Sequence, residues 1–314
     1  MEISATAHYP SFILASWYKF APLEDCEGLK AELLSICQRG GLRGTILLSP
    51  EGINASIGGG RENIHVLLAH LRRLPYFEGL THRETPVQSI PFHRLKVRLK
   101  KEIISLGLTM SPGALVGKHV EPQVWNDLLN DPEVLVLDVR NGYEVGIGTF
   151  EGAANPRLSS FRDFPRFVRE DLDPRRQPKV AMFCTGGIRC EKASALMLAQ
   201  GFRELYQLHG GILGYLDLVS EERSLWEGEC FVFDQRVSVG HGGAQGSYEQ
   251  CYTCRHPVGP AERGSPAYEE GVSCPHCFPW LDAERRRRSR ERHRQVKLAV
   301  ARGGAHIGAP HEAL

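Results

Sequence analysis

One short loop of this sequence has the residue types that activate a cysteine. Cys184 follows a continuous apolar run, Lys179 to Phe183, that is typical of a buried strand, and a helical pattern begins soon after it. In open α/β sheets, ligands bind at this end of the strands. The residues expected to surround the sulfur are Thr185, Gly186, Gly187, Ile188 and Arg189.

The chemistry expected of this loop is nucleophilic. Successive glycines let the backbone fold tightly enough for several N–H groups to converge on one point. Those dipoles, the helix dipole and the Arg189 guanidinium all favour a thiolate over a thiol. Because the thiolate is the reactive form of cysteine, we expect Cys184 to be ionised and open to a docked substrate. The plainer interpretation is a buried cysteine that ends its strand.

The length of the loop separates two chemistries. Four residues lie between Cys184 and Arg189, whereas a phosphate-binding cysteine phosphatase loop places five there. The smaller cradle suits a sulfur atom or a small anion more than a phosphate ester, so a phosphatase is disfavoured. Cys190 is either a resolving thiol or a small packing residue at the start of a helix.

A second set of cysteines has the spacing of a metal site. Cys251 and Cys254 form one CxxC pair, Cys274 and Cys277 form another, and 19 residues separate the pairs. This spacing predicts a four-cysteine structural zinc site, which stabilises a segment too small to build its own core. The alternatives are reduced free thiols in a loop-rich segment or a labile redox pair.

Two clusters of positive charge indicate an anionic partner. One is an alternating strand pattern within 92–100 and the other is an arginine run within 283–297, although the formal charge of the whole chain is only +1. Stripes of one sign are better explained by nucleic acid than by a solvated face, which is the plainer interpretation. The candidate RNA-binding residues are Arg94, Lys96, Arg98, Lys100, Arg285, Arg286, Arg287 and Arg288.

Composition excludes several classes of protein. With 314 residues, 42% hydrophobic and 24% charged, the chain is too apolar to be disordered and long enough for two or three domains. No stretch approaches about 18 consecutive apolar residues, and the N-terminus has no basic region before an apolar run. We therefore expect a cytoplasmic protein, without a membrane span, in which disulfides are disfavoured.

The N-terminal segment is expected to form a domain of its own. Residues 1–100 alternate strand and helix patterns in the order β-α-β-β-α-β, which predicts a ferredoxin-like α+β domain whose last strand is 92–100. The Gly- and Pro-containing segment 101–120 is expected to be a linker.

The remaining segments position the cysteines. Apolar strands at 134–137, 179–183 and 205–208 alternate with helical patterns, so 121–228 is predicted to be an α/β domain with a central parallel sheet and helices on both faces. Residues 229–282 form the Cys-rich segment. Residues 283–314 form a basic tail, helical or disordered, with disorder expected over 301–314.

Motifs spread over residues 10–282 resemble a known family. The Cys184 loop, Asp138-Val139-Arg140 and Leu208-His209-Gly210-Gly211-Ile212 are similar to a rhodanese domain. The segments Glu51-Gly52-Ile53-Asn54, Phe161-Arg162-Asp163-Phe164-Pro165 and Gly228-Glu229-Cys230-Phe231-Val232-Phe233-Asp234 narrow the resemblance to the rhodanese-domain tRNA uridine(34) hydroxylases. One departure is Gly146-Ile147-Gly148, where many rhodaneses place Gly-His-Ile.

The resemblance implies oxygen-dependent 5-hydroxylation of the wobble uridine of tRNA, with molecular oxygen as co-substrate and tRNA as partner. It implies that Cys184 is catalytic, as nucleophile or persulfide carrier, and that Arg189 and the loop amides stabilise its anion. Asp138 and Arg140 resemble the Asp-x-Arg motif that supports the loop. We identify no flavin or nicotinamide motif and no His-x-Asp/Glu pattern suggesting a facial iron triad.

Two other hypotheses stay open. A rhodanese-type sulfurtransferase carrying a cysteine persulfide would turn over thiosulfate without RNA, but it leaves both basic clusters unexplained. A non-catalytic RNA-binding or zinc-scaffold protein would be unaffected by Cys184→Ala. The presence of Cys184, Gly186, Gly187 and Arg189 together argues against this last hypothesis.

Overall fold

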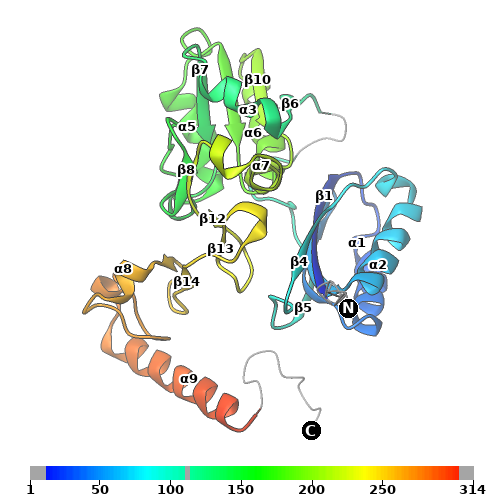
Figure 1. Cartoon of the computed structure of the whole chain (residues 1–314). Coiled ribbons are helices and arrows are strands. Elements are labelled where there is room, and N and C mark those ends of the chain that lie inside the picture. The colour runs from blue at the N-terminus through cyan, green and yellow to red at the C-terminus, as the bar shows by residue number, and fades with distance from the viewer. Residues whose placement is uncertain (1–11, 110–113, 304–314) are drawn as a thin grey trace, which may run out of the picture. The chain divides into compact units, whose positions relative to one another are not determined.

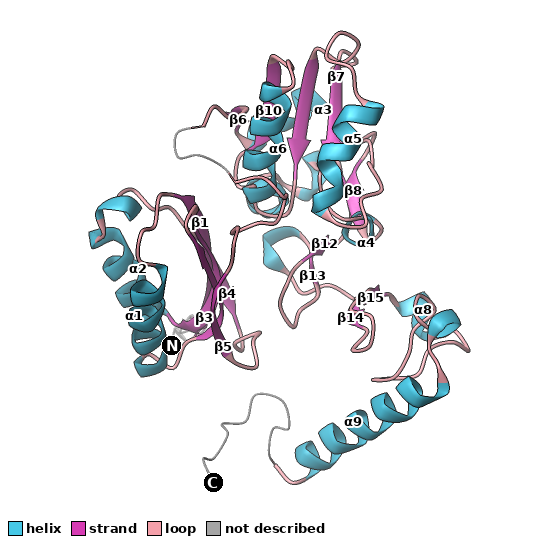
Figure 2. Cartoon of the chain, turned by 180° about the vertical axis from the view of Figure 1, so that it is seen from behind, coloured by secondary structure: helices cyan, strands magenta, loops and turns pink. Residues whose placement is uncertain are grey.

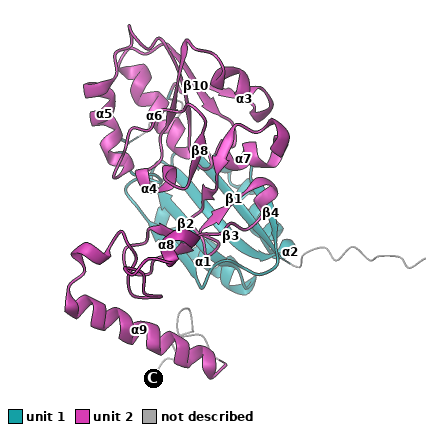
Figure 3. Cartoon of the chain, turned by 60° about the vertical axis from the view of Figure 1, so that its left-hand side comes forward, with its two compact units in different colours: residues 1–114 teal, residues 115–314 magenta. Residues whose placement is uncertain are grey.

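The structure is a computed structural model that describes residues 12–109 and 114–303. The chain divides into two compact units, Met1–Ala114 and Leu115–Leu314, which Figure 3 colours separately. None of the helices within the described ranges has the length and apolar character needed to cross a membrane.

The first unit is a five-stranded sheet with two helices on one face (Figure 1). Its strand order is β4-β1-β3-β2-β5, in which only the β2–β5 pair is parallel. The order of the first four strands is that of the predicted ferredoxin-like fold. The elements are β1 (Phe12–Phe20), α1 (Cys26–Arg39), β2 (Arg43–Ser49), β3 (Gly52–Gly60), α2 (Arg61–Arg73), β4 (Arg83–Val87) and β5 (Leu95–Leu99).

One strand of this sheet was not predicted from the sequence. The predicted last strand, 92–100, corresponds to β5, which is an added edge strand beside β2. The fourth strand of the fold is β4, at the opposite edge. It contains Glu84 and Pro86 and therefore lacks an apolar alternation, and proline is tolerated in a sheet mainly at such edges because it cannot donate a ladder hydrogen bond.

The second unit contains a four-stranded parallel sheet in the order β6-β10-β9-β7, as predicted for a rhodanese-like domain. Helices α3 and α7 pack together on one face and α5 and α6 on the other (Figure 2). The elements are β6 (Lys118–Val120), α3 (Pro122–Leu129), β7 (Val134–Asp138), α4 (Gly142–Val145), β8 (Gly148–Phe150), α5 (Phe164–Asp171), β9 (Lys179–Phe183), α6 (Ile188–Ala199), β10 (Glu204–Leu208) and α7 (Gly211–Leu218).

The segment expected to be a linker, 101–120, is shorter in the structure. Lys118–Val120 forms β6 and pairs with β10 at the edge of the parallel sheet. A strand of three residues with two polar side chains carries no periodicity that the sequence could reveal.

An aromatic cluster fixes the end of β9 from which Cys184 extends. The ring of Phe183 packs edge-on against Phe150, with ring centroids 4.8 Å apart. Phe150 in turn packs edge-on against Tyr215 of α7 and against Trp226. Because edge-to-face pairs add to the burial of these large rings, the strand end is held rigidly.

The chain beyond α7 contains short elements and one long helix. The elements are β11 (Trp226–Gly228), β12 (Cys230–Phe231), β13 (Ser238–Val239), β14 (Glu249–Gln250), β15 (Pro257–Val258), α8 (Pro260–Arg263) and α9 (Ala283–Ala301). The basic tail is therefore largely helical, and Asp282 caps α9 by accepting a hydrogen bond from the backbone N–H of Arg285 at 2.7 Å. Most of the predicted disordered stretch, 304–314, lies outside the described residues.

Candidate active site

The Cys184 sulfur lies in a ring of hydrogen-bond donors between β9 and α6. The backbone N–H of Gly187 donates to Sγ at 3.2 Å. The Cys190 thiol and the backbone amides of Arg189 and Cys190 also donate to it. Gly187 precedes α6 with a φ of 95°, a left-handed conformation that glycine adopts without strain. This turn aims the amides of the loop at one atom.

These donors decide the ionisation of the thiol. Burial alone would raise the pKa of Cys184, but the Cys190 hydrogen bond, the positive charge of Arg189 and the backbone amides outweigh it and lower the pKa to about 6. Burial and the neighbouring thiolate raise the pKa of Cys190 well above its ordinary value, so Cys190 stays protonated. At neutral pH, the pair is a thiolate with a thiol donating to it.

The expectation of an open thiol is wrong for this structure, because Cys184 is 0% exposed. The N-terminus of α7 closes against the loop: the N–H of Ile212 donates to the Cys184 carbonyl at 3.0 Å. At Gly211, a Cβ would lie 2.5 Å from that same carbonyl oxygen, so only glycine fits there. Gly186, by contrast, is half-buried, and a Cβ added to it would meet no other heavy atom within 4 Å. The loop therefore reaches the surface at Gly186.

The guanidinium of Arg189 is held by a carboxylate. Arg189 donates two hydrogen bonds to Glu144, at 2.7 and 2.6 Å, and a third to the Thr185 hydroxyl at 3.2 Å. Burial would raise the pKa of Glu144, but the charge and hydrogen bonds of Arg189 lower it. Glu144 therefore holds the Arg189 guanidinium in place next to the sulfur and partly neutralises its positive charge.

Glu144 was not among the site residues predicted from the sequence, because a helix of four residues, α4, shows no periodicity. One signal was present. Asn141 and Glu144 have the spacing of a capping box, and Glu144 accepts a hydrogen bond from the Asn141 N–H at 3.0 Å. That contact holds the carboxylate in position for Arg189.

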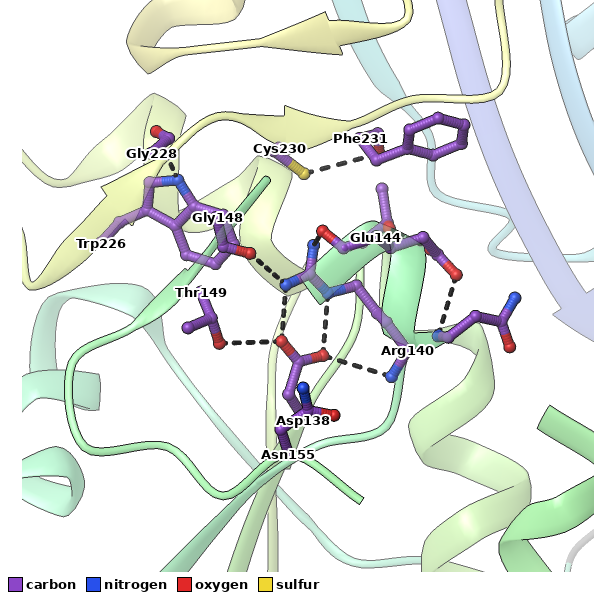
Figure 4. A network of polar contacts seen from close by, with 12 residues as sticks. Asp138, Arg140, Glu144, Gly148, Thr149, Asn155, Trp226, Gly228, Cys230 and Phe231 are labelled. Carbon is purple, nitrogen blue, oxygen red and sulfur yellow. Dashed lines mark hydrogen bonds and ion pairs between the residues drawn. The ribbon is translucent and has the colours of Figure 1, made fainter. Parts of the chain in front are cut away.

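Asp138 and Arg140 form a fully buried ion pair behind this carboxylate (Figure 4). Arg140 donates to both carboxylate oxygens of Asp138, at 2.8 and 2.5 Å, and to the carbonyl of Gly148 at 2.6 Å. It also reaches the backbone carbonyl of Glu144 at 3.4 Å. Asp138–Arg140 and Glu144–Arg189 are therefore two buried ion pairs, joined through the backbone carbonyl of Glu144, in a line that leads to the Cys184 loop.

The four cysteines of the C-terminal segment come together. Their sulfurs all lie within 4.8 Å of one another, and three pairs are 3.9, 3.5 and 3.9 Å apart: Cys251–Cys277, Cys254–Cys274 and Cys274–Cys277. A tetrahedral zinc ion with Zn–S bonds of about 2.3 Å places its sulfurs about 3.8 Å apart. The donor set and its spacing therefore fit zinc.

The predicted basic residues fall on two elements. In β5, Leu95, Val97 and Leu99 pack on the helical core, whereas Arg98 is exposed and Lys96 is half-buried. Arg94 and Lys100, which flank the strand, are exposed. In α9, Arg286 donates to the carbonyls of Leu281 and Phe278, both at 3.1 Å, with its guanidinium 4.1 Å from the centre of the Phe278 ring. Arg286 thus braces its own segment, whereas Arg285, Arg287 and Arg288 are exposed.

The chain does contain a His-x-Glu pattern, contrary to the expectation that none would suggest a facial iron triad. His82-Arg83-Glu84 is such a pattern, and the structure places His65 beside it. Both histidine Nε2 atoms approach one oxygen of Glu84, at 2.7 and 2.9 Å. However, Arg72 donates to Nδ1 of His82 at 2.9 Å, so Nε2 of His82 carries the ring proton and has no lone pair for a metal. We infer no metal site there.

Comparisons with known proteins agree with this architecture. Residues 12–103 match the UPF0176 acylphosphatase like domain, and residues 121–218 match the rhodanese-like domain. The chain is 49% identical over 298 residues to a tRNA uridine(34) hydroxylase from Agrobacterium fabrum, an alignment that covers 95% of each chain. It is 50% identical over 298 residues to a protein of the same name from Teredinibacter turnerae, covering 95% of this chain and 93% of that relative.

Proposed function

This chain belongs to the tRNA uridine(34) hydroxylase family, and from that premise we propose that it catalyses the oxygen-dependent 5-hydroxylation of the wobble uridine of tRNA. The observation that carries the proposal is the Cys184 sulfur, which is held as a thiolate by the Gly187 amide, the Cys190 thiol and the Arg189 charge. The buried line of charges behind it supports Asp138 and Arg140 as positioning residues.

A thiolate accounts for the regiochemistry of the reaction. Addition of the Cys184 sulfur to C6 of the uracil ring forms an S–C6 bond and moves an electron pair toward the O4 carbonyl, which makes C5 nucleophilic. One atom of molecular oxygen then bonds to C5 and the other leaves as water, with two electrons supplied by an external two-electron reductant and, in the net reaction, two protons supplied by solvent. Loss of the C5 proton and expulsion of the Cys184 thiolate restore the aromatic ring.

The burial of Cys184 sets a condition on this chemistry. The sulfur reaches a base only when the loop between β9 and α6 moves away from the N-terminus of α7. We propose that tRNA binding drives this opening, since a flipped-out base is the usual substrate of enzymes that modify bases.

The four-cysteine cluster is proposed to hold structural zinc, which would supply four metal–sulfur bonds that fold the segment around it. The partner is tRNA, bound through exposed basic residues such as Arg98 of β5 and Arg288 of α9. Because tRNA is the proposed substrate, we propose that the protein acts in the cytoplasm.

The test is nucleoside mass spectrometry of tRNA from cells that lack this protein, complemented by wild type or by Cys184→Ala. We expect 5-hydroxyuridine-derived nucleosides to be restored by wild type alone. Restoration by Cys184→Ala would refute the role of the sulfur. If wild type restores nothing but the purified protein turns over thiosulfate without RNA, the sulfurtransferase alternative holds.

Trapping examines the covalent step directly. Transfer RNA containing 5-fluorouridine should form a covalent adduct with wild type that survives denaturation, because fluorine at C5 blocks completion of the reaction. Cys184→Ser should form none. Failure of the wild type to form any adduct, at concentrations where it binds the tRNA, would exclude addition to C6.

A further inference from the structure

A basic cavity of about 420 Å³ lies where the four-cysteine segment meets α9. This size is within the range of about 300–1,000 Å³ common for small-ligand sites. The residues that line it are Thr253, Trp280, Arg285, Arg288, Ser289 and Arg292. The three arginines belong to the arginine run singled out in the sequence, whereas Thr253 and Trp280 lie outside it, so the cavity defines a site that the run alone does not.

Two residues in or next to the CxxC pairs, Thr253 and Trp280, line this cavity. Thr253 lies between the first pair of cysteines, and its hydroxyl donates to the Val272 carbonyl at 2.7 Å and contacts the hydroxyl of Ser289 at 3.2 Å. Trp280 follows the second pair, and its indole N–H donates to the His276 carbonyl at 3.0 Å. The ring is therefore anchored at its nitrogen while 53% of the residue remains exposed.

The helix presents different charge environments on two faces. Arg285, Arg288 and Arg292 are spaced along one face, where the acidic contacts are long and exposed: 3.5 Å from Arg285 to Asp282 and 3.8 Å from Arg288 to Glu284. Arg292 donates to the backbone carbonyl of Tyr252 at 3.4 Å. Positive charge on this face is thus available to an outside anion.

The neighbouring face is neutralised. Arg290 donates two hydrogen bonds to Glu269, both of 2.6 Å, and Lys297 donates to Glu270 at 3.0 Å. The cavity on that side, about 460 Å³, is lined by both carboxylates and is unsuited to a phosphate. The contrast between the two cavities singles out the one beside Trp280.

We propose that the cavity beside Trp280 binds one unpaired nucleotide of the RNA substrate. The base stacks on the exposed indole, and the flanking phosphates bind the Arg288 and Arg292 guanidiniums. An exposed aromatic ring beside exposed guanidiniums whose acidic contacts are long is a combination by which proteins bind single-stranded RNA. This inference rests on the proposed function for the identity of the RNA as tRNA.

The experiment uses the full-length zinc-loaded protein and unmodified tRNA whose wobble position is uridine. Dissociation constants are measured at several salt concentrations for wild type, Trp280→Ala, Trp280→Phe and the double variant Arg288→Gln/Arg292→Gln. The control is Arg290→Gln/Arg294→Gln, which removes the same charge from α9 outside this cavity, at arginines that are paired with Glu269 and Glu291. Zinc content and circular dichroism of each variant establish that it is folded.

We expect Trp280→Ala to weaken binding about tenfold, and Trp280→Phe to keep most of the affinity because it retains a stacking ring. Arg288→Gln/Arg292→Gln should weaken binding and lower the slope of log Kd against log salt by about 1.5, whereas the control should change the affinity much less. If the control loses as much affinity for tRNA as the cavity variant, the loss comes from the overall charge of α9, and the proposal is wrong. A folded Trp280→Ala that binds as wild type does would also overturn it.

Measuring 5-hydroxyuridine formation by the same proteins separates this inference from the proposed function. If wild type hydroxylates tRNA and every cavity variant binds tRNA as wild type does, the cavity is not an RNA site, but the proposed function stands. Stacking-dependent RNA binding by a wild-type protein that never hydroxylates refutes the activity and leaves the cavity as an RNA site.

Discussion

Replacing Cys190 tests whether the hydrogen bond from its thiol lowers the pKa of Cys184. Among the interactions that lower the pKa of Cys184, the hydrogen bond from the Cys190 thiol is the largest. A hydrogen bond to a charged group contributes about 1.5–3 kcal/mol, and a thiol is a weak donor, so we assign about 1.4 kcal/mol, or about one pKa unit. Cys190→Ala should therefore raise the pKa of Cys184 from about 6 to about 7.

Cys190→Ser is the matched control, since a hydroxyl keeps a donor at the same position. Its Cys184 pKa should stay near 6 or fall. At pH 6.5, the thiolate fraction of Cys184 should drop from about three-quarters in wild type to about one-quarter in Cys190→Ala, a threefold change. The two variants remove similar volumes from a buried position, so packing alone does not separate them.

The assay is alkylation of Cys184 by iodoacetamide, followed by peptide mass spectrometry across pH 4 to 9. The absolute rate reports the burial of the sulfur, and the midpoint of the rate against pH reports its ionisation. Identical midpoints in both variants would show that the Cys190 thiol does not stabilise the anion. A wild-type midpoint near 9 would refute the thiolate itself and, with it, the proposed catalysis.

Three further outcomes follow from contacts described above. Because folding lowers the pKa of Cys184 from 9.0 to about 6, its ionisation stabilises the folded state above pH 9 and ceases to do so as the pH falls to 6. The difference in unfolding free energy between wild type and Cys184→Ala should accordingly rise from pH 6 to 9 by up to about 1.4 kcal/mol per pH unit in urea titrations, and a flat difference would contradict this. Metal analysis should find one zinc ion per chain in the purified wild type and less in Cys274→Ser. A wild-type protein without zinc would contradict this. Asp138→Asn leaves the Arg140 charge buried and unpaired and should cost about 3–5 kcal/mol by denaturant unfolding, whereas Glu133→Gln, which breaks an exposed ion pair, should cost under about 1 kcal/mol.

Local sequence determines the parts of the site that depend on adjacent residues. The strand–loop–helix around Cys184 follows from one apolar run and two glycines, and the spacing of the two CxxC pairs predicts that the four cysteines lie together. These features were predicted because the residues that define them are neighbours in the chain.

The parts that were missed depend on distant contacts. The burial of Cys184 comes from the α7 backbone at Gly211 and Ile212, 27 or more positions further along the chain. The role of Glu144 depends on a partner 45 residues away. Arg286 differs from its neighbours in the arginine run because it donates to the carbonyls of Leu281 and Phe278, in the turn before α9. The charge pattern of the sequence does not reveal this contact.

The buried line from Asp138 through Arg140 and Glu144 to Arg189 also bears on how such a site changes over time. Each carboxylate is balanced by one guanidinium, Asp138 by Arg140 and Glu144 by Arg189, so replacing one member of a pair leaves its partner unmatched in a medium that cannot solvate it. Substitutions should therefore arise in compensating pairs, and relatives should change both members of a pair together rather than one at a time.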